Sequence, residues 1–246
     1  MPETGDDTVT GRITVPAYTA DQVRAAEQPL LEAGEPLMRR AAAALAHVVQ
    51  GLVDEELDEH PEEDVRVLVL AGSGDNGGDA LFAAAALQRA EVHVLSTGKR
   101  VHEKALATAL AEGAELVQLT DVRDAEPVYD LVLDGILGIG AASDPALRGL
   151  AREVVETLLP AVRAADSRVV AVDLPSGLQP DDGTTADDAV LPASVTVTFG
   201  AAKAGLALGR GPEFVGEIVL VDLGLGDGLA DDPAVAEASV ARVIEG

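Results

Sequence analysis

The chain has 246 residues, enough for one α/β domain or two small ones. Hydrophobic residues make up 48% of it and aromatic residues 2%, which excludes wholesale disorder and disfavours the aromatic platforms that stack single-stranded nucleic acid. The 43 acidic and 17 basic side chains give a net charge of −26, which repels a phosphate backbone, and the absence of cysteine excludes disulfides, thiolate nucleophiles and zinc–sulfur sites.

The N-terminal part predicts a tail and a helical lead-in. Residues 1–13 are rich in Gly, Asp, Thr and Pro and are predicted to be a disordered acidic tail, which places a single folded domain at 14–246. A capping box over Thr19–Gln22 predicts a helix that ends near Gly34. Apolar spacing predicts a second helix over about 36–58. No signal-peptide pattern or apolar run of about 18 residues is present, so we expect a cytoplasmic protein without a membrane partner.

After the lead-in, apolar runs alternate with helical patterns. The expected strands cover 65–71, 92–95, 115–119, 131–133, 168–172, 195–199 and 218–221. The expected helices between them cover about 79–90, 101–112 and 146–164. This alternation predicts a Rossmann-like three-layer αβα sandwich with a mostly parallel central sheet. Ligands of such folds bind beyond the carboxyl ends of the strands.

A glycine-rich stretch, Gly72–Asp79, follows the first of these strands. Its glycines have the GxGxxG spacing of a dinucleotide-binding turn. The fingerprint is otherwise incomplete, because residues 96–100 contain no acidic residue to bind a ribose hydroxyl, and a nicotinamide-dependent dehydrogenase is therefore disfavoured. We interpret the stretch as inward-facing backbone N–H groups with oxygen ligands from Asp75 and Asn76. The alternative is a tight turn in which Asp79 complements the helix dipole.

Two further strand ends carry similar turns. Asp134–Gly140 follows the strand over 131–133, and Asp173–Gly177 (Asp-Leu-Pro-Ser-Gly) follows the strand over 168–172. The second of these places a carboxylate at the end of a buried strand, as many α/β enzymes do with a catalytic acid or base. Each turn is also explained as an Asx-turn that closes its strand.

The three turns together favour a cation site. Asn76, Asp134 and Ser176 each carry a short oxygen-bearing side chain, and such groups suit a hard cation. The small number of carboxylates favours a monovalent ion and leaves Asp173 free for proton transfer. Lys203 has two open interpretations, a contact to a substrate phosphate or a solvated loop lysine.

Several motifs in chain order resemble the NAD(P)H-hydrate epimerase family of the YjeF N-terminal type. The segments that carry the resemblance are Tyr18–Glu27, Leu37–Ala42, Gly72–Asp79, Asp134–Gly140, Asp173–Gly177, Ala193–Phe199 and Lys203–Gly205. The resemblance implies a repair enzyme that interconverts the R and S epimers of hydrated NADH and NADPH (NADHX and NADPHX). The sequence departs from the family pattern at Asp75, Ala80, Leu137 and Ile139.

The resemblance also implies roles for individual residues. Asn76, Asp134 and Ser176 are expected to bind one potassium ion (K+) per subunit, and Asp173 to act as general acid and base. The residues expected to contact the hydrated dinucleotide are Asp75, Asn76, Gly77, Gly78, Asp79, Gly138, Ile139, Gly140, Ala141, Ala142, Ser143, Asp144 and Asp173.

The resemblance further implies a homodimer and functional coupling to a separate dehydratase that is specific for the S epimer. Lys99 and Arg100 leave the choice between NADHX and NADPHX open. A non-catalytic module of the same fold, for dimerisation, partner binding or nucleotide binding, is the alternative function.

Overall fold

The computed structural model describes residues 11–125, 128–140 and 144–246. Residues 1–10 of the expected tail lie outside the described residues, and the first strand already begins at Ile13. The strands are β1 (Ile13–Tyr18), β2 (Val65–Ala71), β3 (Ala90–Ser96), β4 (Glu115–Leu116), β5 (Leu131–Gly135), β6 (Arg168–Val172), β7 (Val195–Phe199), β8 (Ala202–Lys203), β9 (Glu217–Asp222), β10 (Ala236–Val240) and β11 (Arg242–Glu245).

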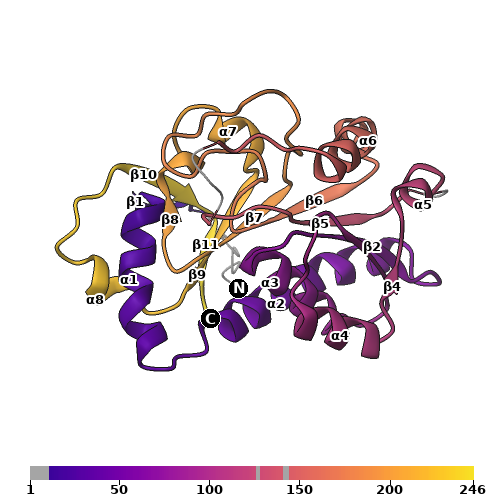
Figure 1. The fold of residues 1–246 in the computed structure, drawn as a ribbon, viewed down its shortest axis with the longest axis horizontal. Helices are drawn as coiled ribbons and strands as arrows, with labels where there is room; N and C mark the ends of the chain where they lie inside the picture. The colour runs from indigo at the N-terminus through magenta and orange to yellow at the C-terminus, as the bar shows by residue number, and fades with distance from the viewer. Residues whose placement is uncertain (1–10, 126–127, 141–143) are drawn as a thin grey trace, which may run out of the picture.

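The helices cover both faces of the sheet and one of its ends. They are α1 (Ala20–Glu32), α2 (Leu37–Glu59), α3 (Asp75–Ala84), α4 (Glu103–Ala111), α5 (Leu119–Arg123), α6 (Leu150–Ala164), α7 (Gly211–Phe214) and α8 (Gly226–Leu229), with a 3-10 turn, η1 (Ala204–Leu206). In Figure 1, α2, α3 and α4 lie on one side of the central sheet, and α5 and α6 lie on the other. The prediction of a Rossmann-like sandwich is confirmed.

The central sheet has eight strands in the order β11-β9-β7-β6-β5-β2-β3-β4, and all of its pairs are parallel. The chain builds outward from β2 through β3 to β4, and then returns to add β5 on the other side of β2. This reversal makes the carboxyl ends of β2 and β5 the topological switch point, where doubly wound folds bind their ligands.

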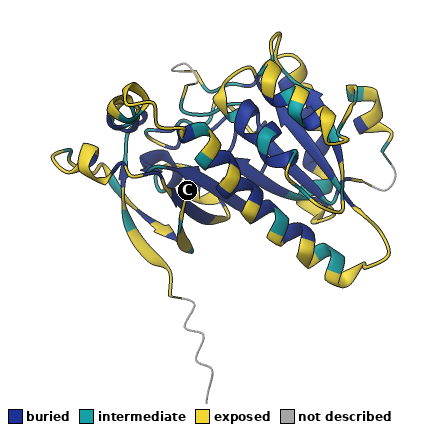
Figure 2. Cartoon of the chain, turned by 90° about the horizontal axis from the view of Figure 1, so that it is seen from below, coloured by how far each residue is buried: buried dark blue, intermediate teal, exposed yellow. Residues whose placement is uncertain are grey.

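Alternate residues of β2 enter two different core layers. Val67 and Val69 pack in the cluster that contains α2 and α3, whereas Leu68 and Leu70 pack in the cluster that contains α6. A strand that is buried on both faces has to be apolar throughout, which explains the continuous apolar run in the sequence. Figure 2 shows the central strands buried and the outward faces of the helices exposed.

Several predicted elements differ in their bounds from those observed; for example, the helix expected over about 146–164 begins only at Leu150. The helix expected over 79–90 begins at Asp75, because Gly74 supplies an extended N-cap, and it ends at Ala84. The strand expected over 115–119 is only two residues long, because Gln118 and Asp121 form a capping box that starts α5. At α5 the capping box determines the boundary, whereas Gly74 precedes α3 without a side-chain hydrogen bond.

A second, three-stranded sheet in the order β10-β1-β8 was not predicted. β1 pairs antiparallel with β10 and parallel with β8. Figure 1 shows this small sheet beside α1, at the end of the molecule where β9 and β11 lie. Its short strands, one of which contains Pro16, give no clear alternation in the sequence. Among the described residues, no helix is long and apolar enough to cross a membrane.

Candidate active site

The first turn of α3 carries several of the candidate residues. The expected loop Gly72–Asp79 is a loop only as far as Gly74, and its remaining residues are helical. Helical geometry places Asn76 and Asp79, three residues apart, on the same face of α3. The first N–H groups of the helix have no intrahelical acceptor, so this end of α3 can bind an anion.

Asp134 lies at the end of β5 and is fully buried. Its Oδ1 accepts a hydrogen bond from Ser176 Oγ at 2.6 Å, and its Oδ2 accepts one from the backbone N–H of Ser176 at 2.8 Å. Burial raises the pKa of Asp134, and the hydrogen bonds from Ser176 and Ile136 partly offset this effect. The carboxyl group thus joins the turn after β6 to the end of β5.

Asn76, on α3, contacts the same backbone segment as Ser176, the residue that hydrogen-bonds to Asp134. Its Nδ2 donates to the carbonyl oxygens of Leu137 at 3.2 Å and of Val172 at 2.5 Å. Ser176 Oγ accepts from the backbone N–H of Leu137 at 2.9 Å, so Asn76 and Ser176 meet at one backbone segment. A Cβ at Gly138 would collide with the Asn76 amide, so glycine is needed here to admit that side chain. The structure therefore brings the three expected ion ligands together.

The donor set of this cluster fits a monovalent cation. Asn76, Asp134 and Ser176 offer one carboxylate, one amide and one hydroxyl group, which are hard oxygen donors with little total charge. Across the described residues, no group of three or more His, Cys, Asp or Glu side chains is placed to hold a metal ion. The arrangement therefore disfavours a tightly held divalent ion.

Asp173 follows β6 and is buried, with 3% of its surface exposed. Its Oδ1 accepts from Lys203 Nζ at 2.5 Å, from Thr198 Oγ1 at 3.2 Å and from the Phe199 N–H at 3.3 Å. Its backbone φ of 71° lies in the left-handed region, an unfavourable conformation that is often found at functional sites. These contacts hold the carboxylate in one orientation, while Oδ2 accepts no hydrogen bond from the described residues.

Lys203 lies in β8, and its surroundings contradict both interpretations made from the sequence, a phosphate contact and a solvated loop lysine. Its side chain is 1% exposed, so it is not a solvated loop lysine. Its Nζ also donates to the Phe199 carbonyl at 2.7 Å and to Thr198 Oγ1 at 3.3 Å. With these contacts and the ion pair to Asp173, all three hydrogens of the ammonium group have acceptors within the protein. The group therefore has no hydrogen left to donate to a substrate phosphate.

Two cavities adjoin at the start of α3. The first, with a volume of about 280 Å³, is lined by Asp79, Asp173 and Lys203 together with apolar side chains from α1 and α2. The second, of about 430 Å³, lies between the turns that follow β2, β3 and β5. Both are lined by Asp75, Asn76 and Ile139. An elongated ligand can therefore occupy both cavities while passing the N-terminus of α3.

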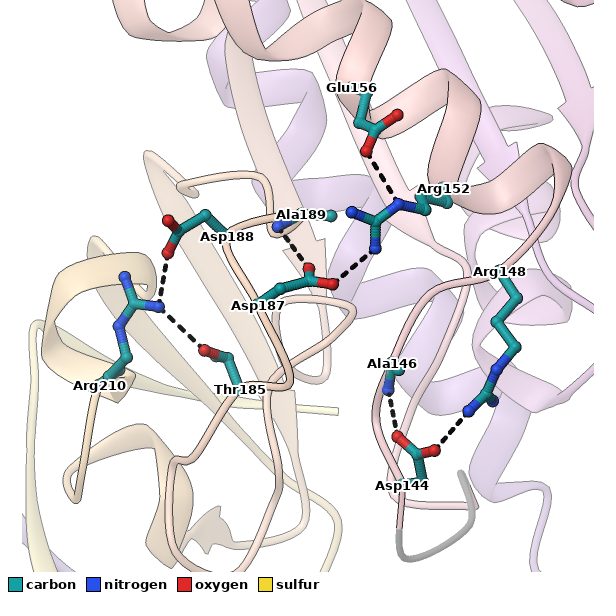
Figure 3. A network of polar contacts seen from close by, with 10 residues as sticks. All are labelled: Asp144, Ala146, Arg148, Arg152, Glu156, Thr185, Asp187, Asp188, Ala189 and Arg210. Atoms are coloured by element: carbon teal, nitrogen blue, oxygen red, sulfur yellow. Dashed lines mark hydrogen bonds and ion pairs between the residues drawn. The ribbon is translucent and has the colours of Figure 1, made fainter.

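The expected substrate-binding residues are distributed unevenly around these cavities. Gly138 and Gly140 line only the second cavity, whereas the buried residues Gly77 and Gly78 line neither. Ala141, Ala142 and Ser143 lie outside the described residues. Asp144 accepts from the Ala146 N–H at 3.0 Å and pairs with Arg148, which lines the second cavity (Figure 3).

Sequence reasoning missed the contribution of the helical lead-in and of β8. Glu27 and Leu31 of α1 and Met38 of α2 form part of the wall of the first cavity. Lys203 forms an ion pair with Asp173, the candidate catalytic residue of that cavity. The available signal was the presence of Glu27, Met38 and Lys203 in the lead-in and Lys203–Gly205 motifs. The small sheet places Lys203 there, because β8 pairs with β1 immediately before α1.

The family model for "YjeF-related protein N-terminus" matches residues 34–205. The chain belongs to this family. The match covers the turns after β2, β5 and β6 and also includes Lys203. Most of the residues that line the two cavities therefore lie within the segment that the family model matches.

Curated YjeF-related relatives extend the similarity beyond this segment. The chain is 57% identical over 213 residues to a protein of Microbacterium testaceum named NAD(P)H-hydrate epimerase, covering 86% of this chain and 79% of that protein. It is 50% identical over 216 residues to a protein of the same name from Clavibacter michiganensis, covering 85% of this chain and 90% of that protein. A bifunctional NAD(P)H-hydrate repair enzyme of Mycobacterium tuberculosis is 41% identical over 85% of this chain, which spans 41% of that enzyme.

A solved structure supports the fold assignment. The crystal structure of yeast ynu0 has a TM-score of 0.64 to this protein, at 19% sequence identity. The similarity covers 78% of this chain and 84% of the yeast chain. At this identity it bears on the fold alone.

Proposed function

We propose that this protein is an NAD(P)H-hydrate epimerase, an isomerase that interconverts the R and S epimers of hydrated NADH and NADPH. The observation that carries the proposal is Asp173, a buried carboxylate held by Lys203 in the wall of a cavity that adjoins the N-terminus of α3. The identity of 50–57% to two proteins named as epimerases supports it.

The proposed placement of the substrate follows from the two cavities. The hydrated nicotinamide ring occupies the first cavity, where apolar side chains such as Met38 and Phe199 surround the acidic groups. The pyrophosphate passes the N-terminus of α3, whose free N–H groups suit an anion. The remainder of the dinucleotide extends into the second cavity beside Thr97 and Arg148.

The reaction needs only proton transfer and charge stabilisation. C6 of the hydrated ring carries a hydroxyl group and is bonded to the ring nitrogen, so departure of the hydroxyl as water leaves a cation shared by C6 and that nitrogen. Asp173 serves as general acid towards the departing hydroxyl and as general base when water returns on the other face. Its ionised carboxylate also stabilises the cation that forms beside it.

We further propose that Asn76, Asp134 and Ser176 hold one K+ per subunit. The supporting observation is Asp134, a fully buried carboxyl group whose hydrogen-bond partners among the described residues are uncharged. A bound cation would supply fixed positive charge near the substrate and offset the cost of burying this carboxylate. The three side chains orient the turns after β5 and β6 and thereby position Asp173.

The cellular setting is proposed on the same grounds. The epimerase acts with a separate dehydratase that consumes the S epimer, a coupling consistent with the bifunctional repair enzyme among its relatives. A cytoplasmic homodimer completes the proposal. Sedimentation of the purified protein tests the dimer.

A coupled assay tests the activity. In potassium buffer, an S-specific dehydratase first exhausts the S epimer of NADHX, and this protein is then added while the absorbance of restored NADH is followed. We expect a rapid second rise with the wild type and a loss of 10² to 10⁴-fold with Asp173→Asn, the usual range for a general acid–base group. A folded wild type that does not accelerate the second phase contradicts the proposal and favours a non-catalytic binding module.

A further inference from the structure

Asp79 lines the first cavity, and it differs from Asp173 and Lys203, the other buried polar side chains there, in having a buried oxygen without a hydrogen-bond partner. It is 6% exposed, and its Oδ1 is the one buried side-chain oxygen or nitrogen among the described residues that has no hydrogen-bond partner. Its carboxyl group makes no ion pair with a described residue either. Buried polar groups are nearly always satisfied, so an orphaned carboxyl group in a cavity wall indicates a partner that arrives with the ligand.

Lys203 cannot supply the acid of the proposed reaction. Its ammonium group has three hydrogens, and it donates to three acceptors, on Asp173, Thr198 and Phe199. Asp173 itself is held as the charged partner of this lysine. A second group that carries a proton is therefore needed where the hydroxyl departs, and Asp79 lines the same cavity from a different element.

We propose that Asp79 is a second catalytic residue, the acid that protonates the departing C6 hydroxyl while Asp173 accepts the proton of the returning water. This inference rests on the proposed epimerase function. It revises the proposed mechanism in one respect: Asp173 keeps the role of base, and the role of acid passes to Asp79 on α3, so that each face of the ring has its own proton carrier.

The steps balance without any further reactant. Asp79 gives its proton to the hydroxyl, the C6–O bond breaks, and one water leaves behind a cation at C6 and the ring nitrogen. A water then forms a C6–O bond on the other face and gives a proton to Asp173. Transfer of that proton from Asp173 back to Asp79 through cavity water restores the starting state.

The surroundings of Asp79 keep its proton in place. Burial, followed by the negative charges of Asp173, Asp75 and Glu27, raises its pKa to about 8. Lys203, the cation that lines the same cavity, is paired with Asp173. Asp79 is thus protonated at neutral pH and can donate, whereas a carboxyl group with an ordinary pKa would already be ionised.

The test compares Asp79→Asn with the wild type at constant potassium concentration. Asparagine keeps the shape but carries no acidic proton, so we expect kcat to fall at least 100-fold while KM changes less than fivefold. The wild-type rate should fall above about pH 8, and the residual rate of the variant should lack this alkaline limb. Asp54→Asn, an exposed substitution on α2, serves as the matched control and should retain the wild-type rate and profile.

A direct titration makes the test independent of the variant's folding. In the wild type, the ¹³C signal of the Asp79 carboxyl should titrate near pH 8, and a midpoint below pH 6 would overturn the proposal. An active wild type whose Asp79→Asn variant keeps kcat and the alkaline limb contradicts only the role of Asp79. A wild type without epimerase activity overturns both this inference and the proposed function.

Discussion

Asp134 and Asp173 lie at the carboxyl ends of the neighbouring strands β5 and β6, and both are buried, but their surroundings differ. Asp134 accepts hydrogen bonds from uncharged groups, mainly of Ser176. Asp173 forms an ion pair with Lys203 and lines a cavity. Position at a strand end therefore does not determine the chemistry of a carboxylate, whereas its partner and its access to ligand do.

The carboxyl ends of β5 and β6 thus differ in what they can do. The β5 end is joined to α3 and to the turn after β6 through neutral hydrogen bonds, and we propose an organising role for it. The β6 end holds a charge at the wall of a cavity, and we propose a chemical role for it. Substitutions that remove one partner at a time should separate these two tasks.

Lys203→Met should have the largest effect on stability. It leaves Asp173 buried without its cation, and breaking a buried pair in this way costs about 3–5 kcal/mol. Urea unfolding at pH 7 measures the loss, and the double variant with Asp173→Asn should recover much of it. A loss below about 1 kcal/mol would contradict the buried ion pair, since exposed pairs give values of that size.

Asp79→Asn should change how stability depends on pH. The pKa of Asp79 is about 8 in the folded state against an ordinary value of 3.8, so between these values the folded protein binds more protons than the unfolded one. Its contribution to the free energy of unfolding is therefore complete below pH 4 and declines as pH rises to 8, by at most about 1.4 kcal/mol per pH unit.

The variant lacks this decline, so its stability relative to the wild type should increase steadily from pH 5 to pH 8. Urea unfolding at several pH values measures the difference. A constant difference across this range would show that Asp79 titrates at an ordinary pKa.

Ser176→Ala should have an intermediate effect at the β5 end. It removes the hydrogen bond to Asp134 Oδ1 and the acceptor of the Leu137 N–H, and it leaves buried groups unsatisfied at a cost of about 1–3 kcal/mol. If the cluster holds K+, the stabilisation of the wild type on replacing sodium by potassium should shrink in the variant. Thermal unfolding in the two salts checks this, and an unchanged ion response would contradict a role of Ser176 in ion binding.

Arg152→Ala should have the smallest effect. Arg152 pairs with Asp187 at 2.6 Å and with Glu156 at 2.8 Å on the surface (Figure 3). Exposed ion pairs contribute little and are screened by salt, so we expect a small decrease in the melting temperature that disappears in 1 M sodium chloride. A loss as large as that of Lys203→Met, or one that salt does not change, would contradict the contrast between surface and buried pairs.

Much of the central sheet could be predicted because its strands are apolar on both faces. The runs at 65–71 and 168–172 match β2 and β6 residue for residue. The turns after β5 and β6 could be found from their polar residues, and the structure does bring Asn76, Asp134 and Ser176 together. These features depend on local pattern and on the rule that parallel strand ends share one edge.

The rest depends on contacts between distant segments. The pairing of β8 with β1 buries Lys203 against Asp173, and no local pattern in the sequence encodes that pairing. The pKa of Asp79 likewise arises from burial and from Asp173 and Glu27, which lie far from it in the chain. Asp79 could be predicted as a site residue but not as an acid.

Isotope incorporation during epimerisation tests the central claim most directly. The purified R epimer of NADHX is incubated in H₂¹⁸O with the wild type or with Asp173→Asn. The S epimer that forms is separated, and its mass is measured by mass spectrometry. The account predicts that the wild type rapidly forms S epimer carrying one ¹⁸O at C6, and that Asp173→Asn forms it at little more than the spontaneous rate. S epimer formed by the wild type no faster than in buffer alone, or formed rapidly without ¹⁸O, would contradict the account.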